Sequence, residues 1–138
     1  MADNSGKIVR SDGEWRTLLT PMQYKVLREK STERPFTGML EQNTQTGDYL
    51  CAACGALLFH SDAKFDSGCG WPSFTLPADS TAVDEHEDQS HGMHRIEVTC
   101  ARCGGHLGHV FPDGPAPKGL RYCINSVSLT FTREKPAA

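Results

Sequence analysis

The amino-acid sequence predicts a single, mainly β domain with short helices near its N-terminal end. Helix start signals lie within the first 30 residues. Later in the chain, two runs of residues alternate in polarity, which favours strands. The chain as a whole has thirteen glycines and eight prolines, which fits a fold of short strands and turns. The length of 138 residues is that of one domain. We expect a loose tail over residues 1–10, the domain over 11–133 and a C-terminal tail over 134–138.

Two short helices are predicted between residues 11 and 30. Ser11 can cap the first helix, with Glu14 three residues later completing a capping box. Thr20 can cap the second, with Pro21 at the first helical position and Gln23 able to reach back to the cap. The second helix should end near residue 30.

Strands and turns are predicted beyond residue 36. The run Arg95–Cys100 alternates apolar and polar residues, and 112–115 is rich in turn-forming residues. The acidic stretch Ala78–His94 is expected to be an exposed loop. Arg121–Phe131 is predicted to be one long strand, whose period of two would place on one face Arg121, Cys123, Asn125, Val127, Leu129 and Phe131.

Charge and hydropathy disfavour several classes of function. The formal net charge is −3 without a basic stripe, which disfavours nucleic-acid binding. The longest mostly apolar stretch, Cys51–Phe59, is far shorter than the roughly 20 residues of a membrane helix. Met1–Asp12 is polar and lacks an apolar signal core. We therefore expect a cytoplasmic, monomeric protein that binds neither membranes nor nucleic acid.

Four of the six cysteines form two similar Cys-x-x-Cys-Gly frames, which predict one tetrahedral zinc site. The frames are 45 residues apart, so the site should join distant parts of one domain and have a structural role. Two disulfides, or a redox Cys-x-x-Cys motif, are the alternatives. We expect no organic cofactor. The predicted ligands are Cys51, Cys54, Cys100 and Cys103.

The other two cysteines have neighbours that suggest chemistry. Arg121 and Asn125 flank Cys123 at a spacing of two, and polar neighbours of this kind are unusual around a buried core cysteine. A nearby cation would lower the pKa of the thiol and favour the thiolate. Cys69 lies between two glycines in a segment that also contains Trp71, which could be core or a pocket wall.

His106 and His109 lie in a glycine-rich segment that disfavours a helix. A histidine of near-neutral pKa suits general acid catalysis, although binding of a metal by this pair is an alternative. The remaining histidines are expected at the surface: His60, His86, His91 and His94.

Taken together, these segments resemble the B-type methionine sulfoxide reductases, which act on the R epimer. The resemblance runs from about Ser11 to Phe131. It depends on several strings that occur in order, namely both Cys frames, Gly-Trp-Pro-Ser-Phe at 70–74, Gly-His-Val-Phe at 108–111 and Arg-Tyr-Cys-Ile-Asn at 121–125.

The resemblance implies a tent-like pair of antiparallel sheets and a repair reaction on oxidised methionine, mainly in proteins. It implies that Cys123 is the catalytic cysteine, Cys69 the resolving cysteine and Trp71 the aromatic side chain that packs on the substrate methyl group. Thioredoxin would be the reductant. Other active-site positions of the family match His106, His109, Phe111, Asp113, Arg121 and Asn125.

Chemistry assigns expected roles within this set. A thiolate at Cys123 would attack the sulfoxide, leaving a sulfenic acid that Cys69 converts to a disulfide. His109 is the first candidate for the general acid and His106 the second. Asp113 is expected to orient a histidine or Arg121.

Three other functions remain as alternatives. A zinc-ribbon binding module would explain the four paired cysteines, but not Cys69 or Cys123. A thiol peroxidase or disulfide oxidoreductase would use the same sulfenic-acid route and differ in its substrate. A zinc hydrolase using His106 and His109 would need an open metal site, which four cysteines do not provide.

Overall fold

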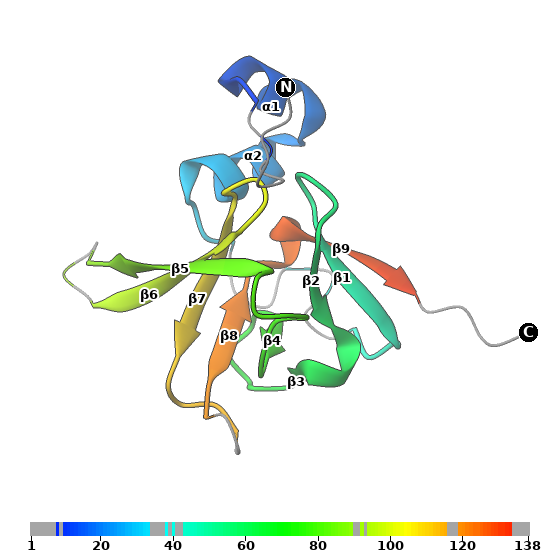
Figure 1. Cartoon of the computed structure of the whole chain (residues 1–138), viewed down its shortest axis with the longest axis vertical. Helices are drawn as coiled ribbons and strands as arrows, with labels where there is room; N and C mark the ends of the chain where they lie inside the picture. The colour runs from blue at the N-terminus through cyan, green and yellow to red at the C-terminus, as the bar shows by residue number, and fades with distance from the viewer. Residues whose placement is uncertain are drawn as a thin grey trace, which may run out of the picture.

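Two antiparallel sheets and two N-terminal helices make up the computed structural model, which confirms the predicted mainly β class (Figure 1). The structure describes residues 8, 10–33, 38, 40, 43–89, 92, 94–115 and 119–133. Most of the predicted N-terminal tail and the whole C-terminal tail lie outside these residues. Neither described helix is long and apolar enough to cross a membrane.

Both helices begin at the predicted caps. Helix α1 (Asp12–Leu18) follows Ser11 and helix α2 (Pro21–Glu29) follows Thr20, and each start has a complete capping box. Helix α2 ends at Lys30, which adopts a left-handed conformation with φ of 63°. This conformation ends the helix and turns the chain away.

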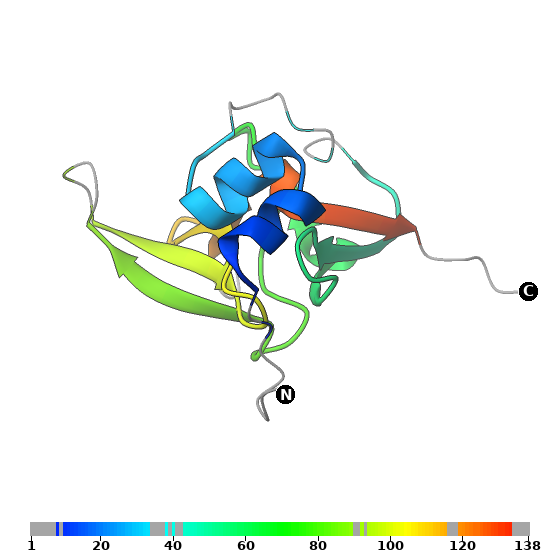
Figure 2. The same cartoon turned by 90° about the horizontal axis from the view of Figure 1, so that it is seen from above.

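The helices lie over the junction between the two sheets when the molecule is viewed from above (Figure 2). The three-stranded sheet has the order β2-β1-β9, and the six-stranded sheet has the order β3-β4-β8-β7-β6-β5. The strands of the smaller sheet are β1 (Gly47–Cys51), β2 (Leu57–His60) and β9 (Leu129–Arg133). Those of the larger are β3 (Lys64–Phe65), β4 (Ser73–Phe74), β5 (Val83–Asp88), β6 (Arg95–Cys100), β7 (His106–Phe111) and β8 (Arg121–Ile124).

The core between the sheets contains a cluster of aromatic rings. Phe74 of the larger sheet stacks on Phe59 with ring centroids 4.3 Å apart and meets the edge of Tyr49 at 5.1 Å. All three side chains are fully buried. Aromatic side chains bury large apolar areas, so this cluster stabilises the packing of one sheet on the other.

The long strand predicted over Arg121–Phe131 is wrong, because the chain divides there into β8 and β9, which belong to different sheets. A short 3-10 helix, η3 (Ser126–Ser128), separates them. The Asn125 side chain accepts a hydrogen bond from the Glu33 backbone N–H at 2.9 Å and donates one to the Leu107 carbonyl at 3.0 Å. These bonds hold the chain where it leaves the larger sheet.

The exposed loop predicted over Ala78–His94 is also wrong in part. Residues 83–88 form β5, an edge strand that pairs with β6 along its whole length. The acidic side chains of 84–87 are exposed, as expected, but Asp88 at the end of the strand is buried. The pattern of charge alone did not distinguish a solvated loop from an edge strand with one inward-facing acid.

The topology places β8 between β4 and β7, in the middle of the larger sheet. Cys123 of β8 therefore lies opposite Ser73 on one side and His109 on the other. The preceding Gly108 allows the close approach of β7 to β8, since a Cβ there would lie 2.0 Å from the Cys123 carbonyl oxygen. The predicted site residues are thus gathered by three neighbouring strands and the segment before β4.

Candidate active site and candidate metal site

The four paired cysteines meet between the two sheets. Their sulfurs all lie within 4.8 Å of one another, with distances of 3.7 Å for Cys51–Cys103 and 3.6 Å for Cys54–Cys100. Four sulfurs held at about 2.3 Å from a central zinc ion would be about 3.8 Å apart. The cluster therefore fits one tetrahedral metal ion, and all four thiols are free of disulfides.

The two Cys frames fold alike. Cys51 ends β1 and Cys100 ends β6, and the glycine after the second cysteine of each frame donates a backbone hydrogen bond to the first cysteine at 2.8 Å. Gly55 and Gly104 both have positive φ, of 80° and 76°. Such a turn suits glycine and aims both sulfurs of a frame at one point. The cluster joins the smaller sheet to the larger.

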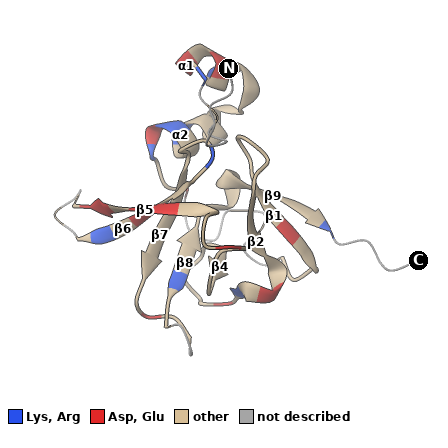
Figure 3. Cartoon of the chain, viewed as in Figure 1, with Lys and Arg blue, Asp and Glu red and all other residues tan. Residues whose placement is uncertain are grey.

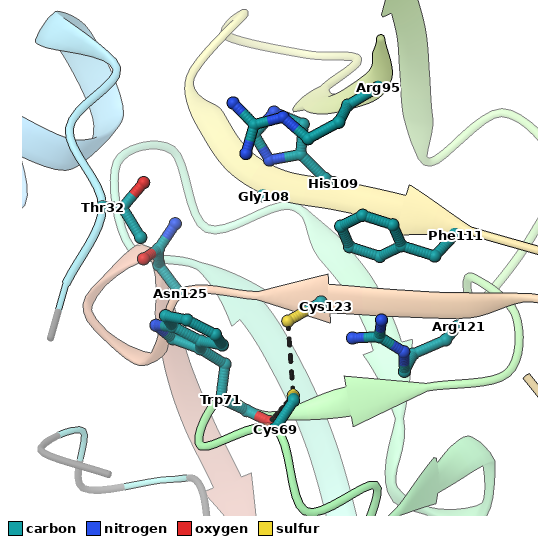
Figure 4. A pocket seen from close by; sticks show the side chains of 10 residues that line it. All are labelled: Thr32, Cys69, Trp71, Arg95, Gly108, His109, Phe111, Arg121, Cys123 and Asn125. Carbon is teal, nitrogen blue, oxygen red and sulfur yellow. Dashed lines mark hydrogen bonds between the residues drawn. The ribbon is translucent and has the colours of Figure 1, made fainter. Parts of the chain in front are cut away.

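A separate pocket of about 220 Å³ opens over β7 and β8 (Figure 4). This volume is smaller than that of a typical drug-sized ligand site and suits a single side chain. Of the residues predicted to be catalytic or substrate-binding, those that line it are Cys69, Trp71, His109, Phe111, Arg121, Cys123 and Asn125.

The two lone cysteines face each other at the base of this pocket. Their sulfurs are 3.4 Å apart, although the residues are 54 positions apart in the chain (Figure 4). The Ser67 hydroxyl donates to the Cys69 sulfur at 3.0 Å, and the Ser73 hydroxyl lies 3.4 Å from the same sulfur. A disulfide between Cys69 and Cys123 would require only a small further approach.

The two thiols differ in pKa. Burial raises the pKa of the Cys123 thiol, the Cys69 sulfur raises it further, and the Arg121 guanidinium opposes both effects without outweighing them. Burial also acts to raise the pKa of Cys69, but hydrogen bonds from Ser67 and Ser73 contribute to a net lowering. The lowered thiol pKa that the sequence predicted for Cys123 is therefore found at Cys69, because burial and a second sulfur dominate at Cys123.

Asp113 orients Arg121 and not a histidine. Its carboxylate accepts two hydrogen bonds from the guanidinium, at 2.8 and 3.1 Å, and these bonds hold the pKa of Asp113 below its usual range. The guanidinium also lies over the Phe111 ring, 4.4 Å from its centroid. The paired acid and the ring together fix the cation beside the pocket.

Trp71 and Asn125 are both fixed by the backbone of Glu33. The Trp71 indole N–H donates to the Glu33 carbonyl at 3.0 Å, and the Glu33 N–H donates to the Asn125 side chain at 2.9 Å. The Glu33 carboxylate accepts from the Val127 N–H at 2.9 Å, and burial raises the pKa of this carboxyl group. One buried residue thus orients two walls of the pocket.

The two histidines have different places. His109 lines the pocket, and its Nε2 lies 2.7 Å from a carboxylate oxygen of Asp88. His106 is buried, and its Nδ1 lies 2.8 Å from Glu97. Burial lowers the pKa of His106, despite the opposing effect of Glu97. His109 is thus the histidine with access to a bound ligand.

The remaining histidines contribute nothing to the pocket among the described residues. His60 is half-exposed beside Asp48, and His86 and His94 are exposed. His91 lies outside the described part of the chain.

Sequence reasoning missed Glu33, Asp88 and Glu97. Asp88 was placed in a solvated loop, and no local pattern distinguishes it from the exposed acids before it. Glu97 alternates with apolar residues in its strand, and this alternation does not indicate what its side chain contacts. Only the pairing of β5, β6 and β7 reveals that Asp88 and Glu97 face histidines.

Comparison with known proteins gives consistent matches over most of the chain. Residues 19–133 match the SelR domain family. The peptide methionine sulfoxide reductase MsrB of Bradyrhizobium diazoefficiens is 65% identical over 123 residues, which cover 89% of this chain and 88% of that protein. The MsrB of Methanosarcina mazei is 61% identical over 98% of this chain and 95% of its own length, and that of Leptospira interrogans is 58% identical over 93% and 98%.

Proposed function

Because this chain belongs to the SelR domain family, together with peptide methionine sulfoxide reductases of the MsrB type, we propose that it reduces methionine R-sulfoxide. It is an oxidoreductase that returns oxidised methionine, mainly within proteins, to methionine. The observation that carries the proposal is the contact of 3.4 Å between the Cys69 and Cys123 sulfurs, at the base of a pocket sized for one side chain.

In the first step, Cys123 is the nucleophile toward the sulfoxide sulfur. Its raised pKa means that the thiol proton leaves as the attack proceeds. The Cys69 sulfur lies within reach to accept this proton, and the positive charge of Arg121 favours the thiolate. Net oxygen transfer breaks the substrate S–O bond, releases methionine and leaves Cys123 as a sulfenic acid.

Protonation of the sulfoxide oxygen assists this step. His109 is the proposed donor, since it lines the pocket beside Cys123 in the neighbouring strand. A positioned general acid accelerates such a step by about 10²–10⁴-fold. Trp71 and Phe111 provide the apolar walls for the substrate methyl group, and Asn125 provides a polar one.

In the second step, Cys69 gives up the proton it accepted, and its sulfur attacks the sulfenic sulfur of Cys123; the proton goes to the departing oxygen. A disulfide forms and the oxygen leaves as water after protonation. The lowered pKa of Cys69 favours the attacking thiolate. A dithiol reductant, which we propose is thioredoxin, then exchanges with the disulfide, becomes oxidised itself and restores both thiols.

We propose that the four-cysteine cluster holds one structural zinc ion. A zinc ion bound by four cysteines has a closed coordination shell, so it supplies stability and not catalysis. The cluster is formed by the ends of β1 and β6 and the turns after them, and thereby ties the two sheets together. We also propose a cytoplasmic monomer whose domain spans residues 11–133.

Separated R and S epimers of a blocked methionine sulfoxide test this proposal, with dithiothreitol as reductant. We expect turnover of the R epimer alone. Replacement of dithiothreitol by thioredoxin, its reductase and NADPH then tests recycling. Failure to reduce either epimer by a folded, zinc-loaded sample would contradict the proposed activity and favour a binding module.

A further inference from the structure

Asp88 is a buried acid at the end of an otherwise exposed row of charges. Its side chain is only 3% exposed, whereas that of the adjacent Glu87 is 68% exposed. Figure 3 shows acidic residues along β5 and a basic residue in the neighbouring strand β6. A carboxylate is rarely buried unless a partner compensates its charge.

The contacts of Asp88 lead directly to the pocket. One carboxylate oxygen lies 2.7 Å from Nε2 of His109 and 3.5 Å from the Arg95 guanidinium. Lys30, at the end of α2, reaches the other oxygen at 3.9 Å and Glu97 at 3.2 Å. Lys30 and Arg95 are therefore the two cations beside the buried acids. Of these acids, Asp88 contacts His109 and Glu97 contacts His106.

The contact with His109 determines which ring nitrogen can face a ligand. A carboxylate accepts hydrogen bonds, so it favours the ring form in which Nε2 carries a proton. Nδ1 is then the nitrogen left for a ligand. An acid in this position also fixes the orientation of the ring, as the aspartate of a serine protease triad does for its histidine.

We propose that Asp88 is a positioning residue for the reductase reaction, which holds the His109 ring by Nε2 and directs a proton on Nδ1 toward the sulfoxide oxygen. The inference rests on the proposed function and adds to it a residue that does not itself line the pocket. Arg95 pairs with Asp88 across the β5–β6 ladder, and Lys30 brings the end of α2 to the same carboxylate. The hairpin of β5 and β6 thereby acts as a support for His109.

The kinetic test compares Asp88→Asn with Glu87→Gln, a matched loss of an acid from the next position of the same strand. We expect Asp88→Asn to lower kcat for the R epimer by about 10–100-fold with KM changed less than about threefold, because it impairs the acid rather than binding. Glu87→Gln should retain full activity. A kcat of Asp88→Asn within about twofold of wild type would overturn the proposal.

A double-variant cycle distinguishes positioning of His109 from a general loss of packing. In a His109→Gln background, Asp88→Asn should lower kcat by less than about twofold, since both changes remove the same function. A further loss equal to that seen in wild type would contradict the proposal. Thermal unfolding of each variant shows whether the fold is retained.

Nitrogen NMR of the unaltered protein provides a test that needs neither a variant nor activity. With histidines labelled by ¹⁵N, the neutral His109 ring should carry its proton on Nε2. A proton on Nδ1 of the neutral ring would overturn the assignment of Asp88. If this test succeeds while no epimer is reduced, the positioning contact stands and the proposed function fails.

Discussion

The molecule contains two groups of cysteines with nearly the same spacing between sulfurs and different surroundings. In the four-cysteine cluster the sulfurs of opposed frames are 3.6 and 3.7 Å apart, and in the pocket pair they are 3.4 Å apart. The cluster lies where β1 and β6 end, in turns shaped by Gly55 and Gly104. The pair lies in an open pocket with hydroxyl, guanidinium and imidazole groups beside it.

The difference shows that neighbouring groups, and not the distance between sulfurs, distinguish the proposed metal site from the proposed redox site. Four sulfurs around one point provide a closed shell for an ion. Two sulfurs of unlike pKa suit the proposed sequence, in which one cysteine is the nucleophile and the other then forms the disulfide. The comparison predicts that loss of a pocket cysteine affects chemistry, whereas loss of a cluster cysteine affects stability.

Removal of the proposed nucleophile should have the largest effect. We expect Cys123→Ser to lower R-epimer reduction by more than about 10³-fold, since a hydroxyl is a far weaker nucleophile than a thiolate. Zinc content and thermal unfolding should match those of the wild type. Appreciable turnover by this variant would remove Cys123 from the nucleophile role.

Removal of the proposed resolving cysteine should leave the first turnover intact and prevent repeated turnover with thioredoxin. We expect Cys69→Ser to release about one methionine per chain and then to lose thioredoxin-driven cycling by more than about 10²-fold. Quenched-flow measurement of methionine checks the first turnover, and NADPH consumption checks cycling. Full thioredoxin-dependent rates would contradict the resolving role.

Loss of a cluster cysteine should mainly lower stability. Cys54 is only partly buried, so Cys54→Ser removes a ligand with little change in packing. We expect Tm to fall by about 10 °C or more and the zinc content, about one ion per chain in the wild type, to decrease. Elemental analysis and calorimetry check this, with Cys69→Ser as the matched control. A Cys54→Ser variant with the Tm of the wild type would contradict the prediction that the four-cysteine cluster stabilises the fold.

Loss of a hydroxyl beside the pocket pair should have the smallest effect. Ser67→Ala removes the bond of 3.0 Å to Cys69, so the pKa of that thiol should rise toward its usual value. Alkylation of Cys69 should then require a higher pH, and cycling should slow by about fivefold, equivalent to about 1 kcal/mol. Measurements in a Cys123→Ser background isolate the alkylation of Cys69. The exposed Ser80→Ala is the control, and an unchanged alkylation profile would exclude a role for Ser67.

The features of the sequence that depend on short-range chemistry were predicted well. Both helix starts follow from a capping residue and a partner three positions later, a contact that no distant part of the chain alters. The strand Arg95–Cys100 follows from its alternation. The four-cysteine cluster follows from two similar frames, because each frame forms its own turn.

Interactions between distant segments were predicted less well. The sequence suggested one strand over Arg121–Phe131, because the alternation continues through residues that in fact turn between two sheets. The bonds of Asn125 to Glu33 and Leu107, which hold this turn, join residues 92 and 18 positions apart. Alternation reports which side chains share a face and not which sheet a strand joins.

By itself, the sequence determined the capped helices and the four-cysteine frames, since local backbone geometry and side-chain chemistry suffice for these. Most of the residues around the pocket were expected from the resemblance to a known family, which depends on the order of several short strings. Only the tertiary structure decided which cysteine has the lowered thiol pKa and which acids face the histidines. Burial and charge act on a side chain through everything packed against it, and at this pocket those neighbours come from segments far apart in the chain.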